Sequence, residues 1–471
     1  MAKKEFPRVH FYDHDLTEMY DLCWQQINTC WQKGTEENGF QSRYFNYPKS
    51  DQINQFEACL STFFLVYGHR SFPVISLLDN FYAKQEEDGA IRGIYQESTG
   101  NPVLTKENPE GILPPLFAWA EYNIYHKVGL KKRVRDIVPK LESYFSWVEK
   151  TFQQENGLYS VPLEATIMIN SPREEACYTV DFNTQQAVAA LYLSALGDVL
   201  NDKEIVYRYK KAYFSLKTRI GGLMWNDEDG IYYDLDKSER QIKVKTAAAF
   251  WPLLAEIPNK VKSEFLINHL TDPDSFGVDN PFPSLARNEK DFDDAGGGYR
   301  GSVFPYLTYI IIKGLEKYGK FVLARECSIK HLYYLLEGLH SADGGSFWEA
   351  YAPVREGPAE WPANKAFPRS SYLPYAGLSS IALMIENVIG LYISLPRKTV
   401  NWIIPSLEIM GIENLALKRN MVSILSNKSG RGWEIRLESE KLYYLTVDIL
   451  ESKKKTLPIP SGKCSILIDK L

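Results

Sequence analysis

Carboxylates in aromatic, glycine-rich segments are the residues of this 471-residue chain best suited to chemistry. Glu349 stands in GGSFWEAYAP, between Trp348 and Tyr351 and just after a glycine turn. Apolar neighbours raise the pKa of a carboxyl group toward working pH, which would suit Glu349 to act as a general base. A hydrogen-bonded structural carboxylate is the alternative, and the residues alone favour neither.

A second group of acids lies in NGLYSVPLEATIMINSPREEACYTVDFNTQQA, and its members are Glu164, Glu174, Glu175 and Asp181. Asp181 comes just before a predicted helix, where an acid can belong simply to the N-cap region. Hydrolysis of a glycoside needs two carboxyl groups facing each other across the bond. Two acid-bearing loops gathered on one face of a scaffold would meet that need.

Other chemistries lose support from the sequence. It contains no P-loop, no GxGxxG after a strand, no HExxH and no GxSxG, and its six cysteines form no CxxC pair. The seven histidines show no metal-ligand spacing. We therefore expect no cofactor and no required metal, although calcium on loop carboxylates stays open.

The charge and hydropathy patterns bound the partners and the location. A net charge of -5 without a long Lys/Arg cluster argues against nucleic acid as a partner. No run of about 18 apolar residues occurs, which argues against a membrane span, and the N-terminus has no signal-peptide pattern. We expect a cytoplasmic protein; a periplasmic or secreted one stays open if a signal peptide has been removed. The oligomeric state is left open.

Apolar residues at spacings of three and four predict the elements that must position these acids. The predicted helices are 15–33, 51–67, 72–86, 112–128, 130–154, 184–201, 202–219, 244–256, 258–270, 302–318, 320–338 and 374–393. Short links join some neighbours, whereas an acid or amide followed by glycine recurs in the long loops, at Gly89, Gly157, Gly230 and Gly344. This recurrence predicts six helical hairpins in two rings, an (α/α)6 toroid over residues 1–394.

The chain changes character after residue 394. Polar and β-branched residues alternate, with turns at NKSGRG and IPSGK, which predicts about seven short strands in an accessory β-sandwich over residues 395–471. Earlier, GGGYRG precedes the helix predicted from 302. Consecutive glycines are kept where a chain turns tightly or where another group approaches the backbone closely.

Seven segments, in order, carry a resemblance to a known family. They are SLLDNFYAKQEEDGAI, PPLFAWAEY, ENGLY with NSPR and VDFNTQQA, DGIYYDLD with KTAAAFWPLLAEIP, GGGYRGSVFPYLTYIIIKGLEKYG, GGSFWEAYAP and YAGLSSIALMIENVIGL. From about residue 50 to 393 the chain resembles the six-hairpin glycosidases of the trehalase, processing α-glucosidase (family 63) and mannosylglycerate-hydrolase-like group, as a divergent bacterial member. The tail TVNWIIPSLEIMGIENLAL is similar to the β-domain of some bacterial members.

The resemblance implies roles for particular residues. Glu349, in WEAY, matches the base that activates water in an inverting displacement, and Arg300 of GGGYRG would donate hydrogen bonds to sugar hydroxyls. The implied sugar-binding residues are Phe56, Glu57, Trp119, Glu121, Arg173, Asp181, Gln185, Tyr299, Arg300, Trp348, Tyr351 and Tyr375.

The chain also departs from the family at the pocket. Ile169 takes the place of the aspartate that serves as general acid, and Phe56 with Glu57 replaces a Trp-Asp pair. Ala295 replaces a second aspartate, and SYLPYAGL replaces an Asp-Phe-Val-Gly-Trp segment. Either another carboxylate serves as the acid, with Glu164, Glu174, Glu175 and Glu57 as the candidates, or the pocket binds sugar without ordinary hydrolysis.

Two functions of different classes follow. The first is an inverting glycoside hydrolase acting on an α-linked glucoside or mannoside. The alternative is a catalytically altered or inactive carbohydrate-binding protein on the same scaffold. A sugar isomerase or epimerase would use histidine acids and bases, and only His69 and His340 lie near helix ends beside long loops, which disfavours that class.

Overall fold

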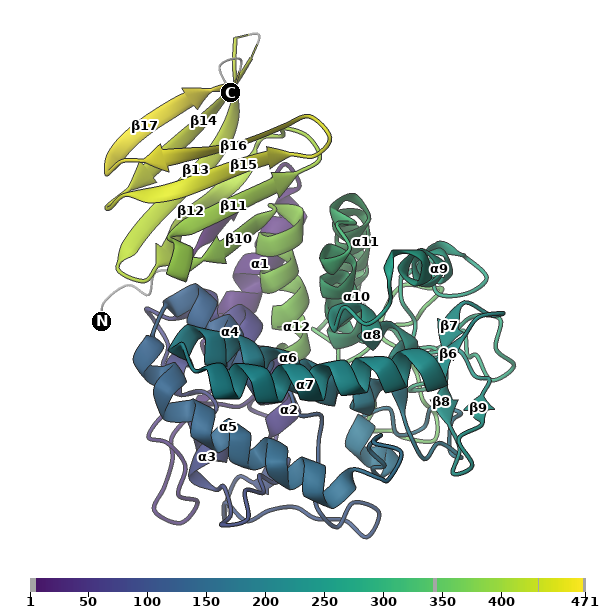
Figure 1. Cartoon of the computed structure of the whole chain (residues 1–471). Coiled ribbons are helices and arrows are strands. Elements are labelled where there is room, and N and C mark those ends of the chain that lie inside the picture. The colour runs from purple at the N-terminus through teal and green to yellow at the C-terminus, as the bar shows by residue number, and fades with distance from the viewer. Residues whose placement is uncertain (1–5, 342–344, 431, 469–471) are drawn as a thin grey trace.

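The computed structural model describes residues 6–341, 345–430 and 432–468, so the glycine of the fourth predicted turn, Gly344, lies outside the described residues. Figure 1 shows a helix-rich region joined to a sheet-rich region that contains the C-terminal part of the chain. The helices are α1 (His14–Ile27), α2 (Gln55–Leu65), α3 (Asp79–Ala83), α4 (Phe117–Val128), α5 (Lys131–Phe152), α6 (Val180–Leu200), α7 (Lys203–Arg219), α8 (Trp251–Leu254), α9 (Lys260–Thr271), α10 (Pro305–Lys317), α11 (Phe321–His340) and α12 (Leu373–Gly377), which continues as the π-helix η6 (Leu378–Val388).

The strands are β1 (Arg8–His10), β2 (Trp31–Gln32), β3 (Tyr44–Phe45), β4 (Gln52–Asn54), β5 (Ile94–Gln96), β6 (Trp225–Asn226), β7 (Ile231–Tyr232), β8 (Asp234–Leu235), β9 (Gln241–Ile242), β10 (Leu391–Ser394), β11 (Thr399–Ile404), β12 (Met410–Leu417), β13 (Asn420–Ser429), β14 (Gly432–Ser439), β15 (Tyr443–Ile449), β16 (Lys453–Ile459) and β17 (Gly462–Leu467). The pairs β2–β3, β4–β5, β6–β7 and β8–β9 are two-stranded sheets in the long loops of the helix-rich region.

Polar caps set the starts of several helices. The side chains of Asp13, Asn54, Asp202 and Asn259 accept hydrogen bonds from backbone N–H groups in the first turns of α1, α2, α7 and α9. Each cap satisfies donors that a helix start leaves without partners. These starts fix where the first-turn side chains of each helix point.

A helix is present in each predicted range, but two of the predicted helices are much shorter than expected. In 72–86 the chain forms a 3-10 turn, Val74–Ser76, followed by the five-residue α3. In 244–256 it forms a 3-10 turn and the four-residue α8, which has Pro252 in its first turn. Conversely, α6 begins at Val180, so Asp181 lies inside its first turn.

The sheet-rich region consists of a five-stranded sheet, β1-β12-β13-β14-β17, and a four-stranded sheet, β10-β11-β15-β16. Seven of these strands, β11 to β17, fall in the segment where the sequence predicts about seven. The N-terminal strand β1 pairs with β12, with Arg8 opposite Glu413, so the start of the chain also contributes to this region. A helix-rich region followed by a sheet-rich one is therefore confirmed, whereas the ring arrangement of the helices and the boundary at 394 and 395 stay predictions.

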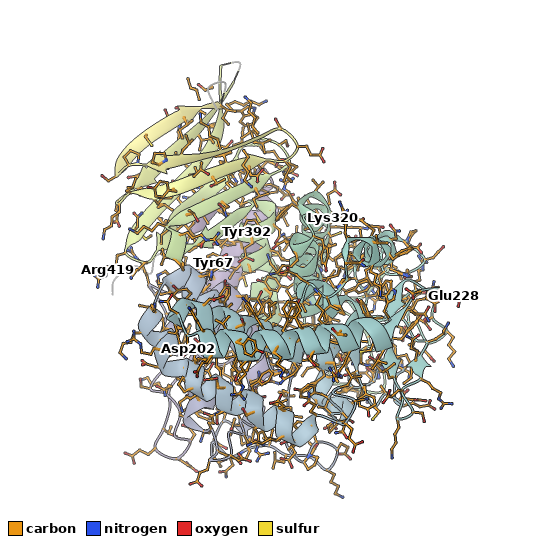
Figure 2. All side chains as sticks on the ribbon, in the orientation of Figure 1. Tyr67, Asp202, Glu228, Lys320, Tyr392 and Arg419 are labelled. Atoms are coloured by element: carbon orange, nitrogen blue, oxygen red, sulfur yellow. The ribbon has the colours of Figure 1, made fainter. Side chains whose placement is uncertain are left out.

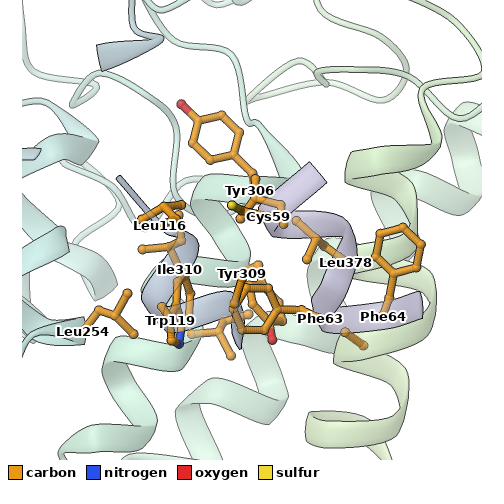
Figure 3. Close-up of a cluster of buried hydrophobic side chains, with 14 of the residues drawn as sticks. Cys59, Phe63, Phe64, Leu116, Trp119, Leu254, Tyr306, Tyr309, Ile310 and Leu378 are labelled. Carbon is orange, nitrogen blue, oxygen red and sulfur yellow. The ribbon is translucent and has the colours of Figure 1, made fainter. Parts of the chain in front are cut away.

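The core of the helix-rich region is strongly aromatic. Phe63 of α2 packs on Trp119 of α4 with ring centroids 4.2 Å apart, and on Tyr309 of α10 at 5.6 Å. Figure 3 shows these rings together, while the hydroxyl of Tyr306 points away from them. Such ring pairs add about 0.5–1.5 kcal/mol each beyond the burial of their area. These rings pack α2, α4 and α10 against one another in the middle of the helix-rich region.

A cavity of about 410 Å³ lies at the C-terminal ends of these helices and is lined partly by β10 and β11. Charged groups in its wall are paired with one another. Glu386 of η6 accepts hydrogen bonds from Lys127 and Tyr67, and its second oxygen lies 2.7 Å from Lys313. Burial alone would raise the pKa of Glu386, but the two lysines outweigh burial and lower it to about 2. This network ties α4, α10 and η6 together.

Acid sensitivity is expected from His331 of α11. The ring is fully buried and bonded to Asn280 and Ser379, and burial lowers its pKa to about 3. As pH falls below about 6.5, His331 becomes protonated in the unfolded chain but not in the folded one. The stability that the neutral His331 supports is therefore fully present above about pH 6.5 and is lost on acidification. Lowering pH from 7 to 5 should cost about 2 kcal/mol through this residue. Urea unfolding at both pH values should show that His331→Asn loses less free energy of unfolding between pH 7 and pH 5 than wild type does. Equal losses in the two proteins would contradict the assignment.

Candidate functional site

The structure places Glu349 in the loop between α11 and α12, where Arg369 of the same loop holds it. Arg369 donates from Nε to Glu349 Oε2 at 2.9 Å and from Nη2 to Oε1 at 2.7 Å. The backbone supports this bidentate pair, because Glu349 N–H donates to the Arg369 carbonyl and Arg369 N–H donates to Glu349 Oε2. Such a fork-like pair fixes the orientation of a carboxylate. The side chain of Glu349 is mostly buried, whereas that of Arg369 is 42% exposed.

Glu57 lies on the other side of Arg369. It occupies the first turn of α2, and its Oε1 lies 3.7 Å from Arg369 Nη2 and accepts a hydrogen bond from the Tyr372 hydroxyl. Burial raises the pKa of Glu57, and Arg369 and Tyr372 oppose that rise only in part. Two carboxyl groups that are far apart in the sequence thus reach the same nitrogen of one arginine. We call Glu57, Glu349, Arg369 and Tyr372 the carboxylate cluster.

Arg369 was missed by the analysis of the sequence. It lies in FPRSSY, two residues before the SYLPYAGL segment, in which the chain departs from the family pattern. An arginine in an aromatic loop beside that segment was the available indication. Its partners are Tyr47 (2.9 Å), Tyr372 (2.8 Å) and the two glutamates, and of these only Glu349 and Tyr372 are near it in sequence.

Aromatic side chains form a wall beside the carboxylate cluster. Tyr375 packs on Tyr372 with ring centroids 4.7 Å apart and on Tyr306 at 5.0 Å, and Tyr306 also contacts Phe56 at 5.2 Å. The Tyr306 hydroxyl donates to that of Tyr299 at 3.4 Å. Burial raises the pKa values of Tyr299, Tyr372 and Tyr375 well above the ordinary one, so their hydroxyls stay protonated donors. Flat rings with polar tips suit the two faces of a sugar.

The glycine loop packs against the IMINSPR segment. Gly296, Gly297 and Gly298 all have positive φ, and a Cβ added to Gly298 would stand 2.7 Å from Asn170 Oδ1. Asn170 fastens the two segments: its Nδ2 donates to the Gly297 carbonyl at 2.8 Å, and its Oδ1 accepts from Tyr299 N–H at 2.7 Å. The glycines therefore provide the turn and the close approach that bring Tyr299 to the aromatic wall.

Gly298→Ala is expected to destabilise the protein by about 1–3 kcal/mol, since alanine resists this positive φ and its Cβ would displace Asn170. Thermal unfolding should register this loss. Gly221→Ala is a matched control, because a Cβ at Gly221 meets nothing within 4 Å. Equal melting temperatures for the two variants would contradict the role given to the loop.

Asp181 belongs to a separate buried cluster with Arg173 and Asp234. Arg173 Nη2 donates to Asp181 at 2.6 Å and Nη1 to Asp234 at 3.1 Å, and Asp234 also accepts from Val180 N–H at the start of α6. The Arg173 side chain is 1% exposed, and its Nε has no partner among the described residues. This arrangement fixes the loop that carries Asn170 to α6. The partner of Asp181 is thus Arg173, which is not part of the carboxylate cluster.

The other candidate acids and Arg300 are exposed or have partners outside the carboxylate cluster. Glu164 accepts a hydrogen bond from Thr105. Glu174 and Glu175 are exposed, and Arg300 is paired with Asp291 and, more loosely, with Glu174. Within the described part of the chain, Glu57 is the one candidate acid that shares a partner with Glu349. Ile169, at the position of the family acid, is 51% exposed.

Five other predicted binding residues have environments of their own. Trp119 lines the 410 Å³ cavity at the opposite ends of the helices, and Glu121 is buried in a bidentate pair with Arg133 of α5. Gln185 and Trp348 each keep a side-chain polar atom without a partner among the described residues. Tyr351 is fully buried, and its hydroxyl accepts from Trp348 N–H at 3.1 Å. These contacts alone assign none of the five to the carboxylate cluster.

Comparisons with known proteins now bear on this arrangement. Residues 75–363 match the family described as mannosylglycerate hydrolase MGH1-like glycoside hydrolase domain, and residues 390–471 match the trehalase C-terminal domain. An uncharacterized protein of Borreliella burgdorferi is 48% identical over 477 residues, covering 100% of both chains.

Two solved structures share the fold. The GH63 mannosylglycerate hydrolase from Thermus thermophilus, in complex with glucose, superposes with a TM-score of 0.60 and 17% identity, covering 78% of this chain and 99% of the other. A GH78 family rhamnosidase of Bacillus sp. GL1 gives a TM-score of 0.70 and 13% identity, covering 94% of this chain and 42% of the other. With the match over more than half of its length, the chain belongs to the MGH1-like glycoside hydrolase family and carries a trehalase-type C-terminal domain.

Proposed function

We propose that this protein is an inverting glycoside hydrolase for an α-linked glucoside or mannoside, built on an (α/α)6 toroid. Glu349 acts as the base that activates water, and Glu57 acts as the proton donor to the leaving group. The observation that carries the proposal is the convergence of these two glutamates, from the first turn of α2 and from the loop before α12, on one arginine nitrogen. The family match and the aromatic wall support a sugar as the ligand.

The assignment of roles follows from the surroundings of each carboxyl group. A carboxyl group whose pKa is raised keeps its proton to higher pH and can serve as the acid. Burial raises the pKa of Glu57, which suits it to donate a proton. The bidentate bonds from Arg369 fix the orientation of Glu349, which suits it to the role of base. Activity should then fall on the alkaline side as Glu57 loses its proton.

Arg369 also sets a requirement for turnover. The nearer oxygens of the two glutamates lie 2.7 and 3.7 Å from the same atom, so the distance between these oxygens is at most the sum of these two values. Inverting enzymes hold the two carboxyl groups about 6.5–9.5 Å apart to admit a water molecule. We infer that a bound sugar displaces the half-exposed Arg369 side chain and opens that space.

Leaving-group dependence tests the acid. Glu57→Gln should reduce kcat/KM for an alkyl α-glucoside or α-mannoside by about 10²–10⁴, because its leaving group needs a proton. For the corresponding 4-nitrophenyl glycosides, whose leaving group departs without protonation, the loss should be far smaller. Equal losses on both substrates would remove Glu57 as the acid and leave it a structural or binding role.

Ile169 favours a second candidate function, a sugar-binding protein without hydrolysis. An isoleucine cannot donate a proton, and this one is half exposed at the position of the family acid. On this alternative, wild type binds sugar and releases no product, while Ile169→Asp gains hydrolytic activity. Hydrolysis by wild type, with no gain in Ile169→Asp, supports Glu57 as the acid.

A further inference from the structure

A second large cavity lies where the helix-rich and sheet-rich regions meet, away from the carboxylate cluster. Its volume is about 820 Å³, within the range of sites for small molecules. It is lined by Tyr125, Gly129 and Leu130 at the junction of α4 and α5, and by residues at three turns. These are Leu395, Pro396 and Lys398 before β11, Leu417, Lys418, Arg419 and Asn420 where β12 turns into β13, and Lys441, Leu442 and Tyr443 at the start of β15. Figure 2 labels Arg419 at the edge of the sheet-rich region nearest the helices.

The charge of this cavity is one-sided. Lys398, Lys418, Arg419 and Lys441 contribute to its wall, and the wall contains no aspartate or glutamate. Within the described parts of the chain, none of these four cations forms an ion pair, although the whole protein has a net charge of -5. All four side chains are exposed, so solvent screens their repulsion, but a wall with cations alone still favours an anionic ligand. The 410 Å³ cavity differs, because its lysines are paired with glutamates.

The turns that carry the cations are fixed by hydrogen bonds. Asn420 Nδ2 donates to the Lys441 carbonyl at 2.9 Å, and its Oδ1 accepts from Lys441 N–H at 3.0 Å. Arg70 Nε donates to the Lys418 carbonyl at 3.4 Å, which ties this turn to the helix-rich region. Lys398 and Lys418 have φ values of 53° and 59°, where glycine or asparagine is usual. Two turns therefore place lysines at the cavity despite an unfavourable backbone conformation.

The rest of the wall is apolar. Leu130, Leu395, Pro396, Leu417 and Leu442 provide aliphatic surface, and Leu442 is 55% exposed. Tyr443 also lines the cavity; it is 1% exposed, and its hydroxyl has no partner among the described residues. Cations around an aliphatic floor match a ligand that joins an anionic group to an apolar body.

We propose that this cavity binds a small free anion with an apolar body, such as the carboxylate, sulfate or phosphate monoester of a short alkyl or aryl chain. The cations hold the anionic group, and the leucines receive the chain. A concave site between two regions suits a free molecule rather than a membrane surface. Because the ligand contacts both regions, its binding stabilises the junction between them. The proposal is independent of the glycosidase assignment, since it uses no residue of the carboxylate cluster.

Calorimetric titration of the full chain with n-octyl phosphate tests the proposal, with inorganic phosphate and n-octanol as partial probes. Octyl phosphate should bind at least about 10-fold more tightly than either partial probe, and its binding should weaken as salt is raised. The double variant Lys418→Gln/Lys441→Gln should bind at least about 10-fold more weakly. Lys211→Gln, an exposed change on α7, should bind as wild type does.

Three results would overturn the proposal: equal binding by the double variant and wild type, equal affinity for inorganic phosphate, or binding to phosphatidylglycerol vesicles without binding to octyl phosphate. The last would assign the surface to a membrane. Circular dichroism of each variant checks that it folds. Glu349→Gln should bind octyl phosphate normally, so a failed glycosidase assignment leaves this test intact.

Discussion

Glu349→Gln is expected to remove hydrolytic turnover by a factor of about 10²–10⁴ or more while the protein stays folded. Glutamine preserves the shape of the side chain and can no longer take a proton from water. Arg369 keeps Tyr47, Tyr372 and Glu57 as partners, and its guanidinium is 42% exposed to solvent, so the lost ion pair should cost little stability. Initial rates on α-glucosides and α-mannosides measure the effect, and thermal unfolding confirms the fold.

Glu356→Gln provides the matched control for this prediction. Glu356 is an exposed glutamate seven positions along the same loop and is not part of the carboxylate cluster. Its variant should turn over substrate like wild type. Unchanged turnover in Glu349→Gln would remove Glu349 as the base and, with it, the mechanism proposed above.

Arg173→Met is expected to destabilise the protein by about 3–5 kcal/mol, because it leaves two buried carboxylates without their cation. Asp181 and Asp234 are 1% and 6% exposed, and both form ion pairs with Arg173. Burial already raises the pKa of Asp234, and loss of Arg173 would raise it further. Urea unfolding measures the change in the free energy of unfolding.

Arg208→Met tests whether burial is the cause. Arg208 stands 3.9 Å from Glu142 with 52% of its side chain exposed, and such surface pairs contribute about 0–1 kcal/mol. A comparably small loss in Arg173→Met would show that Asp181 and Asp234 tolerate the missing cation. The ion pair with Arg173 would then not be needed to hold the loop that carries Asn170, and sugar binding would become the better explanation for Asp181.

The fold was predictable where local patterns decide it. Each predicted range contains a helix because apolar spacing and caps such as Asn54 act within a few residues. The predicted helices 72–86 and 244–256 turned out short. In the second of them, Pro252 lies in the middle of the range and cannot continue a helix that starts before it. The pairing of β1 with β12 places Arg8 opposite Glu413. A local sequence pattern cannot predict a strand partner so far away in the sequence.

The candidate site was predictable only in part for the same reason. Glu349 was found from its aromatic neighbours, and Glu57 entered as one of several candidate acids. That Tyr372 binds Glu57 depends on a contact between residues 315 positions apart, which only the tertiary structure reveals. Arg369, which links both glutamates, carries no local indication of that role beyond its aromatic loop. A single sequence lists the charged groups, and the fold decides which of them meet.

Proton NMR of the sugar first released from an α-glycoside decides whether the enzyme inverts the anomeric centre. The active α-glucoside or α-mannoside should yield the β-anomer before mutarotation, and Glu349→Gln should yield none. Initial release of the α-anomer would contradict inversion and agree with the short separation of Glu57 and Glu349. Binding of sugar with no product from wild type would contradict hydrolysis itself.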